Sequence, residues 1–116
     1  MPPIAHGQLL AELPTPGPEE DFRPLFANGA LRVERIVSHG QVSPVGFWFD
    51  QAEDEWVMVI QGQARLEFAD GRSQDLGPGD WVAIPAHVRH RVASTAVPTV
   101  WLAVHGGTEH PGGEGV

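Results

Sequence analysis

The stretch GPGDWVAIPAHVRHRVAS, residues 77–94, decides the fold class because it contains two short strands and the turns that bound them. Gly79 and Asp80 turn the chain sharply into the first strand. Pro85 ends that strand, since proline has no N–H to donate to a strand ladder. A second strand is predicted to begin at His90.

Alternation within this second strand orients His90. Side chains of a strand point to opposite faces in turn, so His90, Val92 and Ser94 share one face. Arg89 and Arg91 lie on the other face, where two guanidinium groups can reach solvent or a surface partner. The pattern therefore predicts that His90 points into the interior of the protein.

The rest of the chain from Ala30 onward has the same pattern of short strand-like runs separated by turn residues. Runs rich in β-branched and aromatic residues alternate with turn residues, and Asp70-Gly71 is a favourable hairpin turn. The runs are ALRVERIVS, VGFWF, EWVMVI, ARLEFA, DWVAI, HRVAS and TVWLAVH. Many short strands at close spacing predict an all-β barrel or sandwich.

Composition limits the classes of function. A chain of 116 residues is long enough for one domain. Its net charge of −8 disfavours nucleic acid and anionic membranes as partners, because both bind basic patches. The absence of cysteine excludes disulfides, thiolate metal sites and a cysteine nucleophile. No apolar run approaches the roughly 18 residues of a membrane span.

The two ends differ from the middle. Residues 1–29 are predicted to be a proline-rich N-terminal arm, with one short helical turn in PEEDFRPLFANG that ends at Asn28-Gly29. Residues 30–105 hold the β domain, and residues 106–116 are a glycine-rich tail that is expected to be flexible. The N-terminus lacks a basic region followed by an apolar core, so we expect a cytoplasmic protein without a signal peptide.

The spacing in residues 77–94 resembles the second cupin motif, G-x5-P-x-G-x2-H-x3-N. Gly79, Pro85 and His90 match it, whereas His87 stands where the motif has glycine and Ser94 where it has asparagine. His tolerates the left-handed conformation that such a glycine would adopt better than most residues.

The first cupin motif, G-x5-H-x-H-x3,4-E-x6-G, is matched in its second half only, by Glu55 and Gly62. The resemblance extends over about two-thirds of the chain and implies a small single-domain cupin with a jelly-roll β-barrel of six to eight strands. The two histidines of this motif are absent. Their positions fall on Trp48 or Phe49, and on Asp50 or Gln51.

A metal site rebuilt from other ligands would explain why Glu55 is present. Glu55 shares a strand face with Val57 and Val59, and a carboxylate there is costly unless it is paired, protonated or bound to a cation. With His90 it forms a credible ligand pair and a catalytic pair. We predict one divalent transition metal (Fe, Mn, Zn or Ni) with ligands drawn from Asp50, Gln51, Glu55 and His90.

Four further residues are expected to line the substrate pocket. Trp48 is the best candidate for an apolar wall at the mouth of the barrel. His39 and His105 stand at strand ends, where either could complete a two-histidine metal site, although such histidines are commonly exposed. His87 is the fourth candidate.

Three functions follow from this site. The first is a metal-dependent enzyme that acts on a small polar metabolite. The second is a metal-free epimerase, isomerase or dehydratase in which His90 is the general base and Asp50 or Glu55 orients it, although no tyrosine is present to act as the acid. The third is a binding or sensor module without turnover, which the incomplete motif favours.

The resemblance to small cupins also implies a homodimer. Four tryptophans and five phenylalanines are many for so short a chain, and apolar residues lie on both faces of EWVMVI. One face fills the interior, and the other needs cover from a second chain. The N-terminal arm is expected to help by crossing to the partner.

Overall fold

The computed structural model of the protein describes residues 2–106. The tail predicted for residues 106–116 lies outside the described residues, apart from Gly106, which ends the last strand. Among the described residues no helix is long and apolar enough to cross a membrane.

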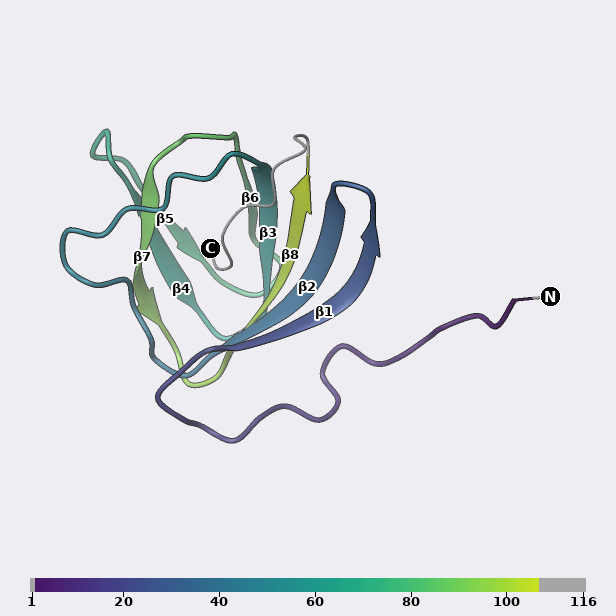
Figure 1. Cartoon of the computed structure of the whole chain (residues 1–116). Helices are drawn as coiled ribbons and strands as arrows, with labels where there is room; N and C mark the ends of the chain where they lie inside the picture. Colours follow the sequence, from purple (N-terminus) through teal and green to yellow (C-terminus); the bar gives the residue numbers. More distant parts are fainter. Residues whose placement is uncertain (1, 107–116) are drawn as a thin grey trace.

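Eight strands form two antiparallel sheets that face each other (Figure 1). The first sheet has five strands in the order β1-β2-β8-β3-β6, and the second has three in the order β5-β4-β7. The predicted all-β jelly-roll fold is confirmed, and within residues 2–106 its strands form two separate hydrogen-bonded sheets, not one closed barrel. The strands are β1 (Asp21–Asn28), β2 (Leu31–Ser38), β3 (Asp54–Gln61), β4 (Ala64–Phe68), β5 (Ser73–Leu76), β6 (Trp81–Ile84), β7 (His90–Thr95) and β8 (Thr99–Gly106).

The helical turn predicted in the N-terminal arm is wrong, because residues 21–28 form β1. β1 pairs with β2 from Asp21 to Asn28, with an irregularity between Pro24 and Phe26, and Gly29-Ala30 is the turn between the two strands. Phe22 packs against the core from this strand. The segment is too short to favour a helix by itself, and the ladder offered by β2 satisfies its backbone better than one isolated helical turn would.

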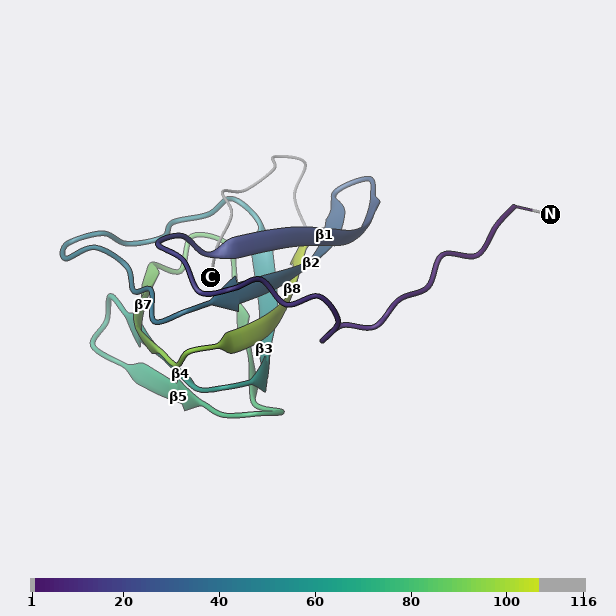
Figure 2. The same ribbon diagram turned by 90° about the horizontal axis from the view of Figure 1, so that it is seen from below.

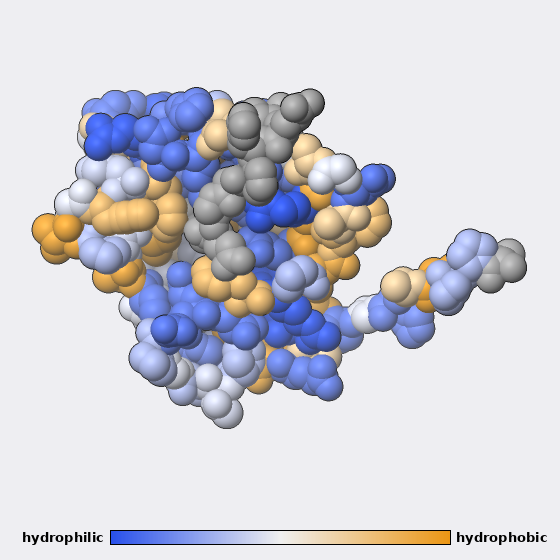
Figure 3. Space-filling view, in the orientation of Figure 1, coloured by the Kyte–Doolittle hydropathy of each residue, from blue (hydrophilic) through white to orange (hydrophobic). Residues whose placement is uncertain are grey.

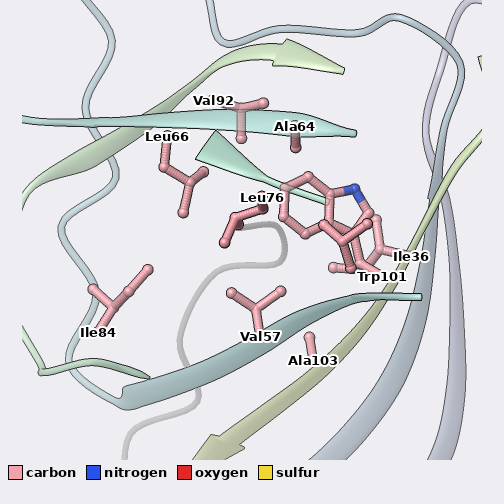
Figure 4. Packing of buried hydrophobic residues seen from close by; sticks show 10 residues of the cluster. Ile36, Val57, Ala64, Leu66, Leu76, Ile84, Val92, Trp101 and Ala103 are labelled. Atoms are coloured by element: carbon pink, nitrogen blue, oxygen red, sulfur yellow. The ribbon is translucent and has the colours of Figure 1, made fainter. Parts of the chain in front are cut away.

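The hydrophobic core fills the space between the two sheets. Trp101 and Ile36 lie in neighbouring strands of the larger sheet, and Leu66 faces them from β4. All three are fully buried. Figure 4 shows Leu66 and Val92 pointing from the smaller sheet toward Val57 and Trp101 in the larger one.

One end of the larger sheet's inner face is polar instead of apolar. Strand register places Arg32, His105, Glu55 and Ile84 side by side across β2, β8, β3 and β6. Ile36 and Trp101 form another inward pair nearer the middle of the sheet. The polar end of this face positions the candidate site.

A hydrogen-bond chain ties the segment before β1 to the core. Trp101 Nε1 donates to Ser38 Oγ at 3.0 Å, and Ser38 Oγ donates in turn to Glu20 Oε2. Burial raises the pKa of the Glu20 carboxyl above its ordinary value, and the Ser38 hydrogen bond opposes this only in part.

The raised pKa of Glu20 predicts a pH-dependent effect of Glu20→Gln. The folded chain binds this proton more tightly than the unfolded chain, so the contribution of Glu20 to stability is fully present below about pH 4.3, the ordinary glutamate pKa. It falls as the pH rises through the raised pKa. The unfolding free energy of Glu20→Gln relative to wild type should therefore increase between pH 4 and pH 7 in urea titrations. Glu19→Gln, at the exposed neighbouring position, is the control, and a flat difference for Glu20→Gln would contradict the prediction.

Gly62, which follows β3, predicts a second stability effect. Its φ is 91°, and an added Cβ would lie 2.4 Å from Pro98 O and 2.8 Å from Thr99 Cα. Gly62→Ala should lower the unfolding free energy by about 3 kcal/mol, because the backbone strain and the collision add. Gly71→Ala is matched in conformation, with φ 94° and open space around it, and should cost only about 1 kcal/mol. Chemical denaturation measures both, and equal losses would contradict the role of the collision.

Candidate active site

Four titratable side chains form a continuous buried cluster at the polar end of the inner face. His90 Nε2 lies 3.5 Å from Glu55 Oε1, and Glu55 Oε2 lies 3.6 Å from His105 Nε2. His105 Nε2 lies 3.1 Å from Glu34 Oε1. The four side chains are at most 7% exposed. Glu55 is thus at the centre of the cluster, with a histidine beside each of its oxygens.

The tautomer of His90 follows from its contacts. His90 is the first residue of β7, and its Nδ1 lies 2.8 Å from Val88 O. A carbonyl oxygen only accepts, so Nδ1 carries the proton of that hydrogen bond. When the ring is neutral, Nε2 therefore holds a lone pair that points toward Glu55. Among the described residues this nitrogen has no hydrogen-bond donor or acceptor.

Glu55 and His90 face each other with buried polar atoms that lack hydrogen-bond partners within residues 2–106. Neither oxygen of Glu55 has a hydrogen-bond partner among the described residues, although both are buried. A bare carboxylate facing a bare nitrogen lone pair away from water is costly. A proton on either group would remove the repulsion between the two electron-rich atoms, which lie 3.5 Å apart.

His105 is held by Glu34, a residue that the sequence analysis missed. Glu34 is 5% exposed and accepts from His105 Nε2 if it is ionised. The alternation that places Glu34 on the same face of LRVERIVS as Ile36 was a usable signal, of the same kind as the one that singled out Glu55. It was missed because Glu34 belongs to no recognisable motif.

Arg32 and Glu53 form an ion pair beside the cluster and were also missed. Arg32 Nη2 donates to Glu53 Oε1 at 2.5 Å, and the Glu53 side chain is 1% exposed. Arg32 is paired with His105 in the strand register. Among the described residues, three buried carboxyl groups lie at this end of the interior, those of Glu34, Glu53 and Glu55, beside the one guanidinium of Arg32.

Asp50 and His87 lie at the surface, away from the cluster. His87 Nδ1 is 2.7 Å from Asp50 Oδ1, and their side chains are 69% and 50% exposed. His87 has a φ of 64°, the left-handed conformation that glycine would adopt at this motif position. Gln51 is buried, and its backbone oxygen accepts from the amide of His87.

The remaining pocket candidates are dispersed. Trp48 is half-buried, and the Arg89 guanidinium lies 5.8 Å from its ring centroid. His39 follows the opposite end of β2 from Arg32, and the seven residue steps from Arg32 to His39 span about 23 Å. The structure thus joins His105 to His90 and Glu55 but leaves His39 and Trp48 apart from them.

The predicted metal ligands are not assembled. Asp50 is engaged with His87, so it does not join Glu55 and His90. Within residues 2–106 no group of three or more His, Cys, Asp or Glu is arranged to hold a metal ion.

Two aromatic rings enclose His90, and each borders a hollow. Phe49 stacks on the imidazole with centroids 5.5 Å apart, and Phe68 lies 6.3 Å away. Phe68 borders a hollow of about 410 Å³ whose rim includes Arg72 and Gln74. Phe49 borders another hollow of about 350 Å³, which Phe47 and Val92 also line. A ligand in either hollow would be one ring away from the imidazole.

Backbone hydrogen bonds fix Phe49 against His90. The amide of Phe49 donates to His90 O at 2.7 Å, and the amide of His90 donates to Phe49 O at 3.2 Å. The loop between β2 and β3 is thereby attached to the start of β7, far away in the sequence.

Comparisons with known proteins agree with this architecture. The chain is similar over 90% of its length to all of a provisional mannose-6-phosphate isomerase from Ralstonia eutropha JMP134, with 50% identity and a TM-score of 0.86. A cupin superfamily protein from Desulfitobacterium hafniense DCB-2 is also similar, with 19% identity and a TM-score of 0.72. The match covers 90% of this chain and 93% of the length of that protein. The EutQ protein of Clostridium difficile is similar with 19% identity and a TM-score of 0.62, and the match covers 75% of this chain and 67% of the length of that protein.

The search of curated proteins found no match. A family model described as the cupin domain matches residues 35–105, which is more than half of the chain. These residues include Glu55, His90 and His105 of the buried cluster. The chain therefore belongs to the cupin family.

Proposed function

We propose that this cupin is an isomerase-type enzyme that moves a proton between neighbouring carbons of a small polar metabolite such as a sugar. The observation that carries the proposal is the Nε2 lone pair of His90, which faces a buried carboxyl that has no other hydrogen-bond partner among the described residues. This is the metal-free function considered from the sequence, with Glu55 rather than Asp50 beside the base.

In the proposed reaction His90 Nε2 takes a proton from the carbon next to a substrate carbonyl. The electron pair of that C–H bond forms a carbon–carbon double bond, and the carbonyl electrons move onto oxygen. Glu55, in its protonated form, donates a proton to that oxygen and gives an enediol. His90 then returns its proton to the former carbonyl carbon, while Glu55 recovers a proton from the neighbouring hydroxyl. Substrate and product are isomers, so no other reactant is needed.

In this scheme His105 lies beside the oxygen of Glu55 that faces away from His90. Its Nε2 lies near both Glu34 Oε1 and Glu55 Oε2, so Glu34 keeps the imidazole oriented toward Glu55. His105 is a positioning residue here, because it reaches the substrate only through Glu55. A substrate reaches His90 by displacing Phe49 or Phe68, the rings that separate it from the two hollows.

The likeness to the provisional mannose-6-phosphate isomerase supports the reaction class, since it extends over nearly the whole chain at 50% identity. It does not identify the substrate of this chain. The metal-dependent enzyme is the second candidate, because His90 and Glu55 present buried donor atoms with no hydrogen-bond partner in the described residues. It requires a third donor to move into place, and iron, manganese, zinc and nickel are the candidate ions. A binding module without turnover is the third.

Deuterium incorporation tests the role of His90. Wild-type protein incubated in D₂O with an aldose or ketose should place deuterium on the carbon next to the carbonyl, which NMR detects. His90→Gln should reduce this exchange by a factor of at least about 100, the usual contribution of a general base. Glu55→Gln should reduce it similarly while substrate binding, measured by calorimetry, persists.

The controls separate chemistry from folding and from metal. His87→Gln lies at the surface and should keep full exchange. Thermal melts must show that His90→Gln stays folded. Metal analysis of untagged protein should find no metal in stoichiometric amount. A stoichiometric ion that is lost in His90→Gln would favour the metal-dependent enzyme, and binding without exchange would favour the binding module.

A further inference from the structure

The hollow of about 410 Å³ beside Phe68, called the Phe68 hollow below, lies between the free edges of the two sheets. β5 is an edge strand of the smaller sheet and β6 is an edge strand of the larger one, and residues of both line the hollow. Figures 1 and 2 both show β5 on the opposite side of the body from β1 and the N-terminal arm. The hollow is thus on the side of the molecule that the arm does not cover.

Two side chains that line the Phe68 hollow also lie beside the proposed reacting groups. Strand register pairs Phe68 with His90, and it pairs Ile84 with Glu55. Residues paired across neighbouring strands have their side chains on the same face of the sheet. A ligand in the Phe68 hollow is therefore separated from His90 and Glu55 by a single layer of side chains.

Arg72 brings a positive charge to the rim of this hollow. Its Cζ lies 5.8 Å from the centroid of the Phe68 ring. Its Nε donates to Asp70 Oδ2 at 2.7 Å, and neither Nη group has a hydrogen-bond partner in the part of the chain that the structure describes. Two guanidinium N–H groups side by side match two oxygens of a phosphate or a carboxylate. Asp70 thus holds the guanidinium in place and leaves its other nitrogens for a ligand.

Gln74 adds a second hydrogen-bond donor on the same side of the hollow. Register pairs it with Leu66, a fully buried core residue, and Leu76 further along β5 is buried as well. Gln74 is therefore an amide in an otherwise apolar inward-facing row. Its Nε2 donates to Asp75 O at 3.0 Å, and an amide nitrogen carries a second N–H. That N–H can donate to a ligand oxygen.

Charge distinguishes the Phe68 hollow from the hollow beside Phe49. Of residues 2–106, those lining the hollow beside Phe49 include Glu20 and no arginine, whereas those lining the Phe68 hollow include Arg72 and no aspartate or glutamate. Hydrophilic residues gather at the end of the smaller sheet where the β4–β5 turn lies (Figure 3). A chain with a net charge of −8 repels anions in general, so an anionic ligand is held best where a cation lines the site and carboxylates do not.

We propose that the substrate is a sugar with a negatively charged group, a phosphate or a carboxylate, at the end far from its carbonyl, and that Arg72 and Gln74 bind this group at the Phe68 hollow. This substrate class rests on the proposed function, because the carbonyl end of the sugar is the end that reaches His90 and Glu55. Phe68 moves aside to let it pass.

The separation of Arg72 from His90 limits the length of the substrate. The guanidinium carbon and the imidazole centroid lie 5.8 Å and 6.3 Å from the same ring centroid, that of Phe68, so they are at most about 12 Å apart. A polar contact at each end takes up about 3 Å. Three bonds of an extended chain cover about 3.8 Å, so the remaining distance of about 6 Å corresponds to about five bonds. The charged group therefore fits the far end of a sugar of about six carbons or fewer.

Calorimetry with three forms of one sugar tests this substrate class. Glucose, glucose 6-phosphate and glucuronate differ in the group at the end far from the carbonyl. One or both of the charged forms should bind the wild-type protein at least about tenfold more tightly than glucose, as expected for hydrogen bonds to a charged group. The tighter of the two identifies the group as a phosphate or a carboxylate.

Two arginine variants test the position of the site. Arg72→Gln should lower the affinity for the preferred charged sugar at least about tenfold and remove its advantage over glucose. Arg65→Gln is the matched control, because it removes the same charge from the same sheet. Arg65 is paired with Asp75 and does not line the Phe68 hollow, so this variant should keep the advantage. Thermal melts verify that both variants are folded.

The outcomes separate this site from the proposed reaction. Equal affinity for the three sugars, or no binding of any of them, overturns the anionic substrate class. Equal losses in Arg72→Gln and Arg65→Gln overturn the role of Arg72. Deuterium exchange into glucose as fast as into both charged forms overturns the anionic class and leaves the proposed reaction standing. Binding of a charged form that depends on Arg72, without exchange into any of the three, supports the anion site and contradicts the proposed reaction.

Discussion

A carboxyl group held between two imidazoles, away from water, is the constraint on which this molecule depends. Glu55 lies on the inner face of the larger sheet near the start of β3, where an aliphatic residue would be the simplest choice, and its two oxygens face His90 and His105. Such a group is tolerable only if its neighbours supply protons or charge. The polar residues around it, from Glu34 to Arg32, are best understood as the surroundings that this carboxyl requires. The apolar core is correspondingly restricted to the other part of the interior, around Trp101.

The same sheet is apolar on the outside where it is polar on the inside. At the level of Glu55 the inner row holds Arg32 and His105, whereas the adjacent outward-facing row runs from Phe26 to Ala83. The two faces of this sheet thus differ in chemistry at the same level of the strands.

The fold was largely predictable from the sequence, because alternation and turn residues act locally. The spacing from Gly79 to His90 identified the family, and alternation correctly placed His90 and Glu55 in the interior. β1 was not predictable in the same way, since its strand conformation is a consequence of the ladder offered by β2. The separation into two sheets likewise depends on hydrogen bonds between distant segments.

The candidate site was predictable only in part. Motif spacing found Glu55 and His90, but it also suggested Asp50 as a ligand, and the loop turns Asp50 outward to His87. Glu34 lies outside both motifs, and only the register between β2 and β8 brings it to His105. A contact that arises from the pairing of remote strands corresponds to no fixed spacing of residues in the sequence, so a motif search does not find it.

The attachment of Phe49 to His90 has a consequence for how this fold can diversify. The loop that encloses the imidazole is bonded to the backbone of the same residue whose ring it covers. Insertions or substitutions that reshape the loop for a new ligand will therefore shift the base as well. Lineages that reshape this loop should show compensating changes at the start of β7.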